Sequence, residues 1–412
     1  MKRTKFLIAL LLMLIFTQCG CGKVQQKTSV NQSEGIEKTK LTLLFYYEGQ
    51  ERFSLINNLC NSFNNQQKVS EVIPEFVPFE DLKKRLLTGV AQGDPPDLVI
   101  YDIPDYAYLA ERGLLEDITE VIKDWEDYEY YFDTSIKSVT YKGRIYGMPV
   151  GENCLELFYN KRMLAEKGLS PPETWTQLKK TALELSNGDV YGLGICAQNS
   201  EQGMYQFLPW FYSAGADIDN LLSSEAVSAF SFVAELVNKG AMSKEIINWS
   251  QADTMKQFAN EKIAMMLNGP WQISELKIKA PNLEYGITRP PMDKKSVTIL
   301  GGENISVVKG KNMDKAFEFL KFFCKAENVR VFTSSMGYFP SRKDVAVSED
   351  LSKPEFRLFK QDVRNARPRG PDPLWPEISK IITNELHELL TEKKSPEEAA
   401  RTAHEAIAKL NN

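Results

Sequence analysis

Short apolar runs alternate with helical patterns along the chain, and this alternation limits the possible folds more than any other feature. The first runs are LTLLFYY from Leu41, EFVPF from Glu75 and DLVIY from Asp97, with helical patterns near 55–63 and 81–90 between them. Strands that alternate with helices predict parallel βαβ units. The residues after Asp97 are apolar in succession, which is typical of a strand covered on both faces. The sequence therefore predicts the α/β class.

Later segments repeat this arrangement. Further strands are predicted at LELFY, YGLGIC, KIAMML and NISVV, separated by helices. Thr174 with Gln177 forms a capping-box pattern, and Ser395 with Glu398 forms another, with proline at the first helical position. The last helix carries one apolar stripe, which predicts a surface helix packed on the body. The stripe consists of Ala399, Ala403, Ala406, Ile407 and Leu410.

The first 20 residues have the order of an export signal. Lys2, Arg3 and Lys5 precede an uncharged run over 6–16, after which small residues follow. A charged start, a short apolar core and small residues are typical of a signal peptide, which we assign to 1–20. The apolar run is shorter than the roughly 20 residues of a membrane span, and no later run reaches that length.

Two cysteines follow the apolar core, and this arrangement resembles a bacterial lipobox, in which the thiol is acylated. We predict lipidation at Cys21, because Gly20 precedes it; Cys19 is the alternative, and an ordinary signal with two incidental cysteines is another. Residues 21–40 are rich in Gln, Lys, Ser, Thr and Asn, which predicts a flexible tether behind the anchor. We expect a protein anchored by lipid on the extracellular face of a Gram-positive cell membrane.

Charge and cysteine content exclude some classes of protein. Loss of the three basic residues of the signal takes the formal net charge from −5 to −8, and no basic stretch with aromatics suggests nucleic acid. Roughly 370 remaining residues predict two lobes of common domain size. Buried free thiols are expected, because no CxxC pair occurs; a single disulfide between two of these cysteines is the alternative. The cysteines concerned are Cys60, Cys154, Cys196 and Cys324.

Enzyme signatures are weak. The two histidines, His387 and His404, each precede a glutamate, but Thr391 and Ala408 stand where a zinc-binding helix needs a second histidine. No GxSxG occurs. We predict no catalytic residues, no metal and no cofactor. A pair of carboxylates for glycoside hydrolysis stays open, because any acidic cleft contains candidates.

Seven stretches of the chain occur in a recognisable order: GDPPDLVIYD, FYNKRMLAEKGLSPPETW, QFLPWFYSAGAD, FANEKIAMMLNGPW, LGGENISVVKGKN, MGYFPSR and PLWPEI. Together they resemble the extracellular solute-binding protein family typified by the maltose-binding and other sugar-binding proteins of ABC importers. The resemblance implies a two-lobed periplasmic-binding-protein type II fold with an interlobe cleft and hinge crossovers. Lobe 1 would comprise 41–149 and 298–340, and lobe 2 would comprise 150–292 and 341–412. Hinges are expected near Pro149, Pro290-Pro291 and Pro340, where proline clusters.

The same resemblance implies a monomer that captures a sugar or oligosaccharide and delivers it to ABC transporter permease subunits. A secreted carbohydrate-active hydrolase is the alternative from another class, and a binding protein that serves a sensor is a third. The ligand class also stays open among sugars, polyols, polyamines and sugar phosphates. Arg289, Arg367 and Arg369 keep the phosphate possible, because guanidinium groups pair well with phosphate.

Candidate ligand contacts come from two arguments. Open α/β sheets bind ligands at the carboxyl ends of their strands, which points to Tyr47, Glu48, Tyr101 and Asp102. Stacking aromatics and hydrogen-bonding groups suit a sugar, with its apolar faces and polar rim. The resemblance supplies these at Asn153, Trp210, Trp271, Glu303 and Trp375. Without it, each tryptophan could equally fill a core, and each polar residue could be a solvated loop residue or cap.

Overall fold

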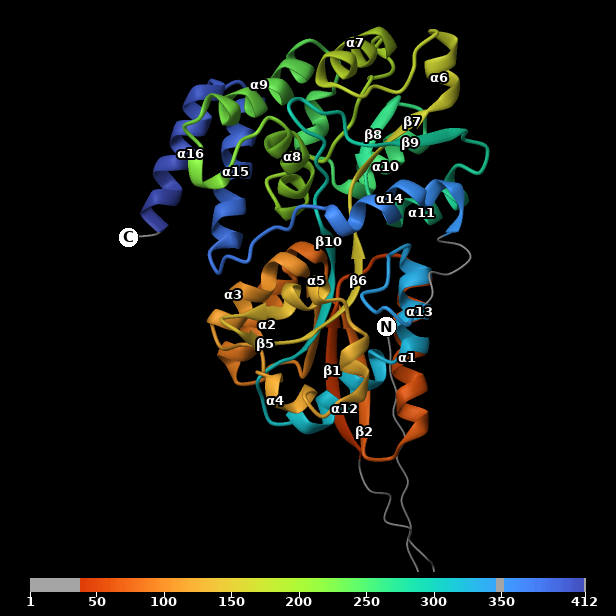
Figure 1. Ribbon diagram of the computed structural model, residues 1–412, viewed down its shortest axis with the longest axis vertical. Helices are drawn as coiled ribbons and strands as arrows, with labels where there is room; N and C mark the ends of the chain where they lie inside the picture. Colours follow the sequence, from red (N-terminus) through yellow and green to blue (C-terminus); the bar gives the residue numbers. More distant parts are fainter. Residues whose placement is uncertain (1–37, 346–351, 411–412) are drawn as a thin grey trace, which may run out of the picture. The chain divides into compact units, whose positions relative to one another are not determined.

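The computed structural model describes residues 38–345 and 352–410 (Figure 1). The predicted signal peptide, Cys19, Cys21 and the tether up to residue 37 lie outside the described residues. The first strand begins at Thr39, so the last two residues predicted as tether belong to a strand. Strand pairing is made by backbone groups, so the polar side chains of Thr39 and Lys40 do not prevent it. The two residues align in parallel with Ser70 and Glu71 of the neighbouring strand.

A five-stranded sheet forms the centre of the first lobe, with the strand order β2-β1-β3-β10-β6. β1 is parallel to β2 and β3, as the βαβ pattern predicts, whereas β10 is antiparallel to β3 and β6. The strands are β1 (Thr39–Phe45), β2 (Ser70–Phe76), β3 (Leu98–Asp102), β6 (Met148–Asn153) and β10 (Gly301–Val307).

Helices cover both faces of this sheet. α1 packs on β2, α12 on β10 and α13 on β6, and Figure 1 shows α2 and α3 on the other side of the strands. The helices of this lobe are α1 (Gln50–Gln66), α2 (Leu82–Gln92), α3 (Tyr106–Glu111), α4 (Thr119–Ile122), α5 (Asp133–Ile136), α12 (Met313–Phe323) and α13 (Ala326–Met336). A small hairpin consists of β4 (Thr140–Tyr141) and β5 (Arg144–Ile145).

The second lobe surrounds an antiparallel sheet with the order β8-β7-β9. Its strands are β7 (Glu156–Asn160), β8 (Met265–Asn268) and β9 (Tyr285–Thr288). α15 packs against α8, α9 and α16. The helices are α6 (Lys161–Glu166), α7 (Trp175–Leu185), α8 (Glu201–Ser213), α9 (Ser224–Asn238), α10 (Gln251–Ala259), α11 (Trp271–Lys279), α14 (Arg357–Asp362), α15 (Trp375–Leu390) and α16 (Pro396–Leu410).

The chain passes between the sheets after β6 and again before β10. These two crossings lie side by side, because the Thr298 hydroxyl accepts from the Leu155 N–H at 3.0 Å and donates to its carbonyl at 2.6 Å. The predicted boundary between 149 and 150 falls inside β6, which continues in the five-stranded sheet to Asn153. Pro149 therefore lies within a strand, four residues before the crossing.

Two predicted strands are wrong in position or type. β2 (Ser70–Phe76) begins before the predicted run and includes Pro74, so only the first two residues of EFVPF belong to the strand. Proline is tolerated there because β2 is an edge strand. YGLGIC makes isolated bridges to the β8 region and no continuous strand. A side chain at Gly192 would overlap the backbone of Ala182, so the glycine permits close packing that a strand residue with a Cβ would prevent.

The helix signals are confirmed. Thr174 and Gln177 form a reciprocal capping box at α7. The Glu398 N–H donates to the Ser395 hydroxyl at 3.2 Å at the start of α16. The α16 stripe is buried at Ala399, Ala403 and Ile407 and partly buried at its other two members. The four cysteines of the folded region are buried and free, and across 38–345 and 352–410 no helix is long and apolar enough to span a membrane.

Candidate functional site

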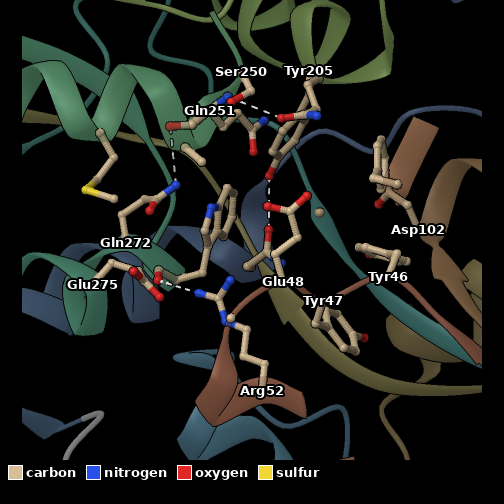
Figure 2. Close-up of a pocket in the computed structure, with 18 of the residues that line it drawn as sticks. Tyr46, Tyr47, Glu48, Arg52, Asp102, Tyr205, Ser250, Gln251, Gln272 and Glu275 are labelled. Atoms are coloured by element: carbon tan, nitrogen blue, oxygen red, sulfur yellow. Dashed lines mark hydrogen bonds between the residues drawn. The ribbon is translucent and has the colours of Figure 1, made fainter. Parts of the chain in front are cut away.

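A cavity of about 330 Å³ lies between residues of the two lobes. Figure 2 shows Tyr46 and Asp102 on one side of it and Gln272 and Glu275 on the opposite side. Six of the predicted ligand residues line this cavity, so the strand-end rule and the resemblance locate the same place. The six are Tyr47, Glu48, Asp102, Asn153, Trp271 and Glu303.

The other three predicted residues do not line the cavity. Tyr101 precedes Asp102 on β3, and since side chains alternate along a strand the two face opposite sides of the sheet. The Tyr101 hydroxyl lies 2.9 Å from the Ser306 hydroxyl in the interior. Trp210 is 1% exposed and packs against Phe232 at 5.5 Å between ring centroids.

Trp375 is also buried, at the first turn of α15. Its indole N–H donates to the Glu201 carboxylate at 3.1 and 3.2 Å. It therefore orients a residue of the cavity without lining the cavity itself.

Side chains at one end of the strands of the five-stranded sheet form one side of the cavity, which we call the strand wall. The parallel strands β1 and β3 end there, whereas the antiparallel strand β10 begins there, and Glu303 of β10 pairs in register with Asp102 of β3. All members are buried except Tyr46, which is half-buried. The strand wall consists of Tyr46, Tyr47, Asp102, Glu303 and Tyr338.

Glu303 is the most isolated carboxyl of the strand wall. Its Oε1 accepts from the Tyr46 hydroxyl at 2.8 Å and from the Tyr338 hydroxyl at 2.9 Å. Its Oε2 is buried and has no hydrogen-bond partner among the described residues. Burial, reinforced by the negative charge of Asp102, raises the pKa of Glu303 to about 8.

Asp102 has a cationic partner. The Arg369 guanidinium donates to both Asp102 oxygens at 2.8 Å and to Glu201 at 2.7 Å, and it lies 4.2 Å over the Tyr205 ring. Burial nevertheless raises the pKa of Asp102 to about 6, against the lowering effect of Arg369. Because Arg369 is only 2% exposed, water does not compensate its charge, and the two acidic residues, which belong to different lobes, do so instead.

Residues of α10 and α11 form the opposite side of the cavity, which we call the helix wall. All five members are half-buried or exposed. Glu275 pairs with Lys279 at 2.7 Å, and Lys256 pairs with Asp253 at 2.9 Å. The helix wall consists of Gln251, Lys256, Trp271, Glu275 and Lys279.

Trp271 supplies the aromatic surface of the helix wall. The glycine of the NGPW turn permits this position of the ring, because a side chain at Gly269 would overlap the indole. The ring is nearly parallel to Tyr205, with centroids 6.4 Å apart and an interplanar angle of 23°, and meets Tyr338 edge-on at 6.3 Å. Arg52 of α1 donates to the Trp271 carbonyl at 3.0 Å, which joins the two lobes directly.

Sequence reasoning missed several cavity residues. Glu201 and Tyr205 are four residues apart in α8 and so lie on one face of that helix, a signal that periodicity contains. Tyr338 occurs in the quoted segment MGYFPSR and follows α13. No sequence signal singles out Arg52, Gln272 or Glu275, which are charged or polar residues on amphipathic helices.

The three arginines considered for an anionic solute all have carboxylate partners. Arg289 is bidentate to Asp362 at 2.6 and 2.9 Å, and Arg367 pairs with Asp217 at 2.7 Å. Only Arg369 of the three lines the cavity. Among the described residues, no group of three or more His, Cys, Asp or Glu side chains is placed to hold a metal ion.

Comparison with known families matches residues 58–357 to the bacterial extracellular solute-binding proteins. The chain belongs to this family. A maltotriose-binding protein of Pyrococcus abyssi is 26% identical over 299 residues, which are 70% of this chain and 62% of that protein. A galactooligosaccharide-binding protein of Bacillus subtilis is 24% identical over 400 residues, 93% of this chain and 92% of the relative.

Among solved structures, an ABC transporter solute-binding protein of Thermotoga lettingae bound with α-D-tagatose is 26% identical. It matches this solute-binding protein with a TM-score of 0.83, over 91% of this chain and 100% of the other. The two-lobed α/β fold predicted from the sequence is therefore confirmed. The family location is extracellular or periplasmic, and these relatives are binding proteins by name.

Proposed function

We propose that this solute-binding protein captures a sugar or oligosaccharide in the cavity and delivers it to an ABC transporter permease, without chemical change. The observation that supports this most directly is the Trp271 ring beside buried polar side chains of the strand wall. A pyranose has apolar C–H faces that stack on an indole and hydroxyl groups that need hydrogen-bond partners. The names of the maltotriose- and galactooligosaccharide-binding relatives agree with this ligand class.

Six residues are proposed as ligand contacts: Tyr47, Glu48, Asp102, Asn153, Trp271 and Glu303. The Asn153 Oδ1 and the Ile299 carbonyl both lie 3.1 Å from the Tyr205 hydroxyl and share its one hydrogen, so the Asn153 amide keeps hydrogen-bonding capacity for a ligand in the cavity. A phosphate is disfavoured, because Arg369 is already paired with Asp102 and Glu201. A neutral sugar therefore fits the electrostatics better than an anionic solute.

Anchoring and domain limits are proposed with this function. We infer a signal peptide at 1–20, lipid on Cys21, a tether that follows it, and a monomer on the outer face of a Gram-positive membrane. Metabolic labelling with a fatty-acid analogue should mark the wild type and not Cys21→Ala. Label retained in that variant but lost in Cys19→Ala would assign the lipid to Cys19, and no label in any form would refute the anchor.

Binding and catalysis are separated by one experiment on the purified protein. Maltotriose, α-D-tagatose, a galactooligosaccharide and glycerol 3-phosphate are titrated by calorimetry, and each mixture is then analysed by mass spectrometry. We expect saturable binding of at least one sugar with its mass unchanged, and a smaller radius of gyration at saturation, because a ligand that contacts both lobes favours the closed state. Hydrolysed sugar would favour the hydrolase, and binding of glycerol 3-phosphate alone would favour an anionic solute.

A further inference from the structure

The partners of Glu303 determine which of its two oxygens can carry a proton. Tyr46 and Tyr338 each have one hydroxyl hydrogen, and both donate it to Oε1. Two donors fill the acceptor positions of that oxygen. A proton on this carboxyl therefore resides on Oε2, which lacks a partner among the described residues and belongs to a side chain that lines the cavity.

The charges around Glu303 decide whether that proton is present. Tyr46 and Tyr47 face it from the end of β1, Asp102 from β3, Tyr205 from α8 and Tyr338 from the segment after α13. Asp102 adds negative charge, which disfavours a second carboxylate nearby.

Two arginines are the cations of this environment. Arg369 holds Asp102 and Glu201, and Arg52 donates to the Trp271 carbonyl, so neither donates a hydrogen bond to Glu303 among the described contacts. The side chain is 4% exposed, so water compensates little of its charge. The pKa of about 8 that results from burial and Asp102 agrees with a neutral carboxyl at neutral pH.

We propose that Glu303 is a specificity-determining hydrogen-bond donor, whose Oε2–H selects a solute group with an acceptor oxygen. This inference rests on the proposed function and narrows it. A ring or glycosidic oxygen, a carbonyl oxygen or a hydroxyl lone pair can accept this hydrogen, whereas an ammonium group, which has no acceptor, cannot. Tyr47 adds a second buried hydroxyl without a described partner, so the strand wall contains two buried polar groups whose hydrogen bonds are unmade among the described residues.

Glu303→Gln and Glu303→Ala distinguish a donor from a carboxylate acceptor. Glutamine keeps an oxygen for the two tyrosines and permanently presents an N–H donor to the cavity, whereas alanine presents nothing. With maltotriose, α-D-tagatose and a galactooligosaccharide as probes at about pH 6.5, alanine should weaken the binding seen in the wild type by about tenfold or more, and glutamine should restore it to within about threefold. Wild-type affinity should fall above about pH 8, and that of Glu303→Gln should not. A tenfold loss in Glu303→Gln would overturn the donor role.

A second measurement needs no ligand. Because the pKa of Glu303 is raised from 4.5 to about 8, its protonated form stabilises the folded protein below about pH 4.5, and this contribution is lost as the pH rises through about 8. The melting temperature of the wild type minus that of Glu303→Gln should therefore decrease between about pH 5 and pH 9. A constant difference would refute the neutral carboxyl.

The two measurements separate this inference from the proposed function. If no probe binds the wild type, the sugar-binding function and the acceptor selection both fail, while the melting curves still decide the protonation of Glu303. If sugars bind and glutamine cannot replace glutamate, the function stands and the donor role fails.

Discussion

The two sides of the cavity differ in burial and in how their polar groups are held. The strand wall contains buried side chains whose partners lie on other strands and helices, such as the Tyr46 and Tyr338 hydroxyls on Glu303. The helix wall carries ion pairs within single helices, Glu275 with Lys279 and Lys256 with Asp253. The strand wall is thus fixed by tertiary contacts, whereas the helix wall depends mainly on local ones.

This difference separates two tasks of a binding site. Buried, oriented groups impose a geometry on the solute, since each unmatched polar atom is costly in a dry environment. Half-exposed groups contribute less, because water replaces their partners at small cost. We therefore expect substitutions of the strand wall or of its buried partners, such as Arg369, to have the largest effects on stability, and Trp271 of the helix wall to matter mainly for binding.

The largest effect is expected for Arg369→Ala. Its removal leaves Asp102 and Glu201 buried without their cation, and breaking a buried ion pair in this way typically costs about 3–5 kcal/mol. The matched control is Lys279→Ala, whose pair with Glu275 is 45% and 25% exposed and should cost at most about 1 kcal/mol. Urea unfolding of the ligand-free proteins measures both. Equal losses would show that the two walls do not differ as described.

A smaller effect, on binding, is expected for Trp271→Ala. Loss of a well-packed aromatic anchor costs about 2 kcal/mol, or roughly thirtyfold in affinity, while ligand-free stability should change less because the ring is only partly buried. Trp210→Ala is the control with the opposite pattern. Its ring is in the core, so unfolding should lose about 3–5 kcal/mol.

Calorimetry on the folded fraction and urea unfolding of each variant decide between these roles. Trp271→Ala that loses stability and keeps its affinity would place the indole in the core. Trp210→Ala that stays stable and loses affinity would instead restore the original prediction for that residue.

The fold and part of the site could be predicted, for physical reasons that differ between residues. β1 and β3 are apolar runs between turn residues, so their carboxyl ends, and with them Tyr47 and Asp102, follow from local pattern. The prediction that Trp210 contacts the ligand is not supported by the structure, which places it in the core. The segment FLPWFY is apolar on every side, and in a helix this indicates burial and not a binding surface. Arg369 pairs with a residue 267 positions away, and no local pattern contains that contact.

The smallest expected effect tests the one hydrogen bond that joins α1 directly to the helix wall. Arg52→Ala removes the donor to the Trp271 carbonyl, a contact that exists only while the lobes are close. A hydrogen bond of this kind contributes about 1 kcal/mol, so the affinity for the bound sugar should fall by about fivefold through a less favourable closed state. Arg52→Lys keeps a cationic donor and should recover part of the loss. Small-angle scattering of ligand-free protein should show a larger radius of gyration for Arg52→Ala than for the wild type. An unchanged radius with reduced affinity would mean that Arg52 contacts the sugar itself, and the two walls would then be coupled only through the bound solute.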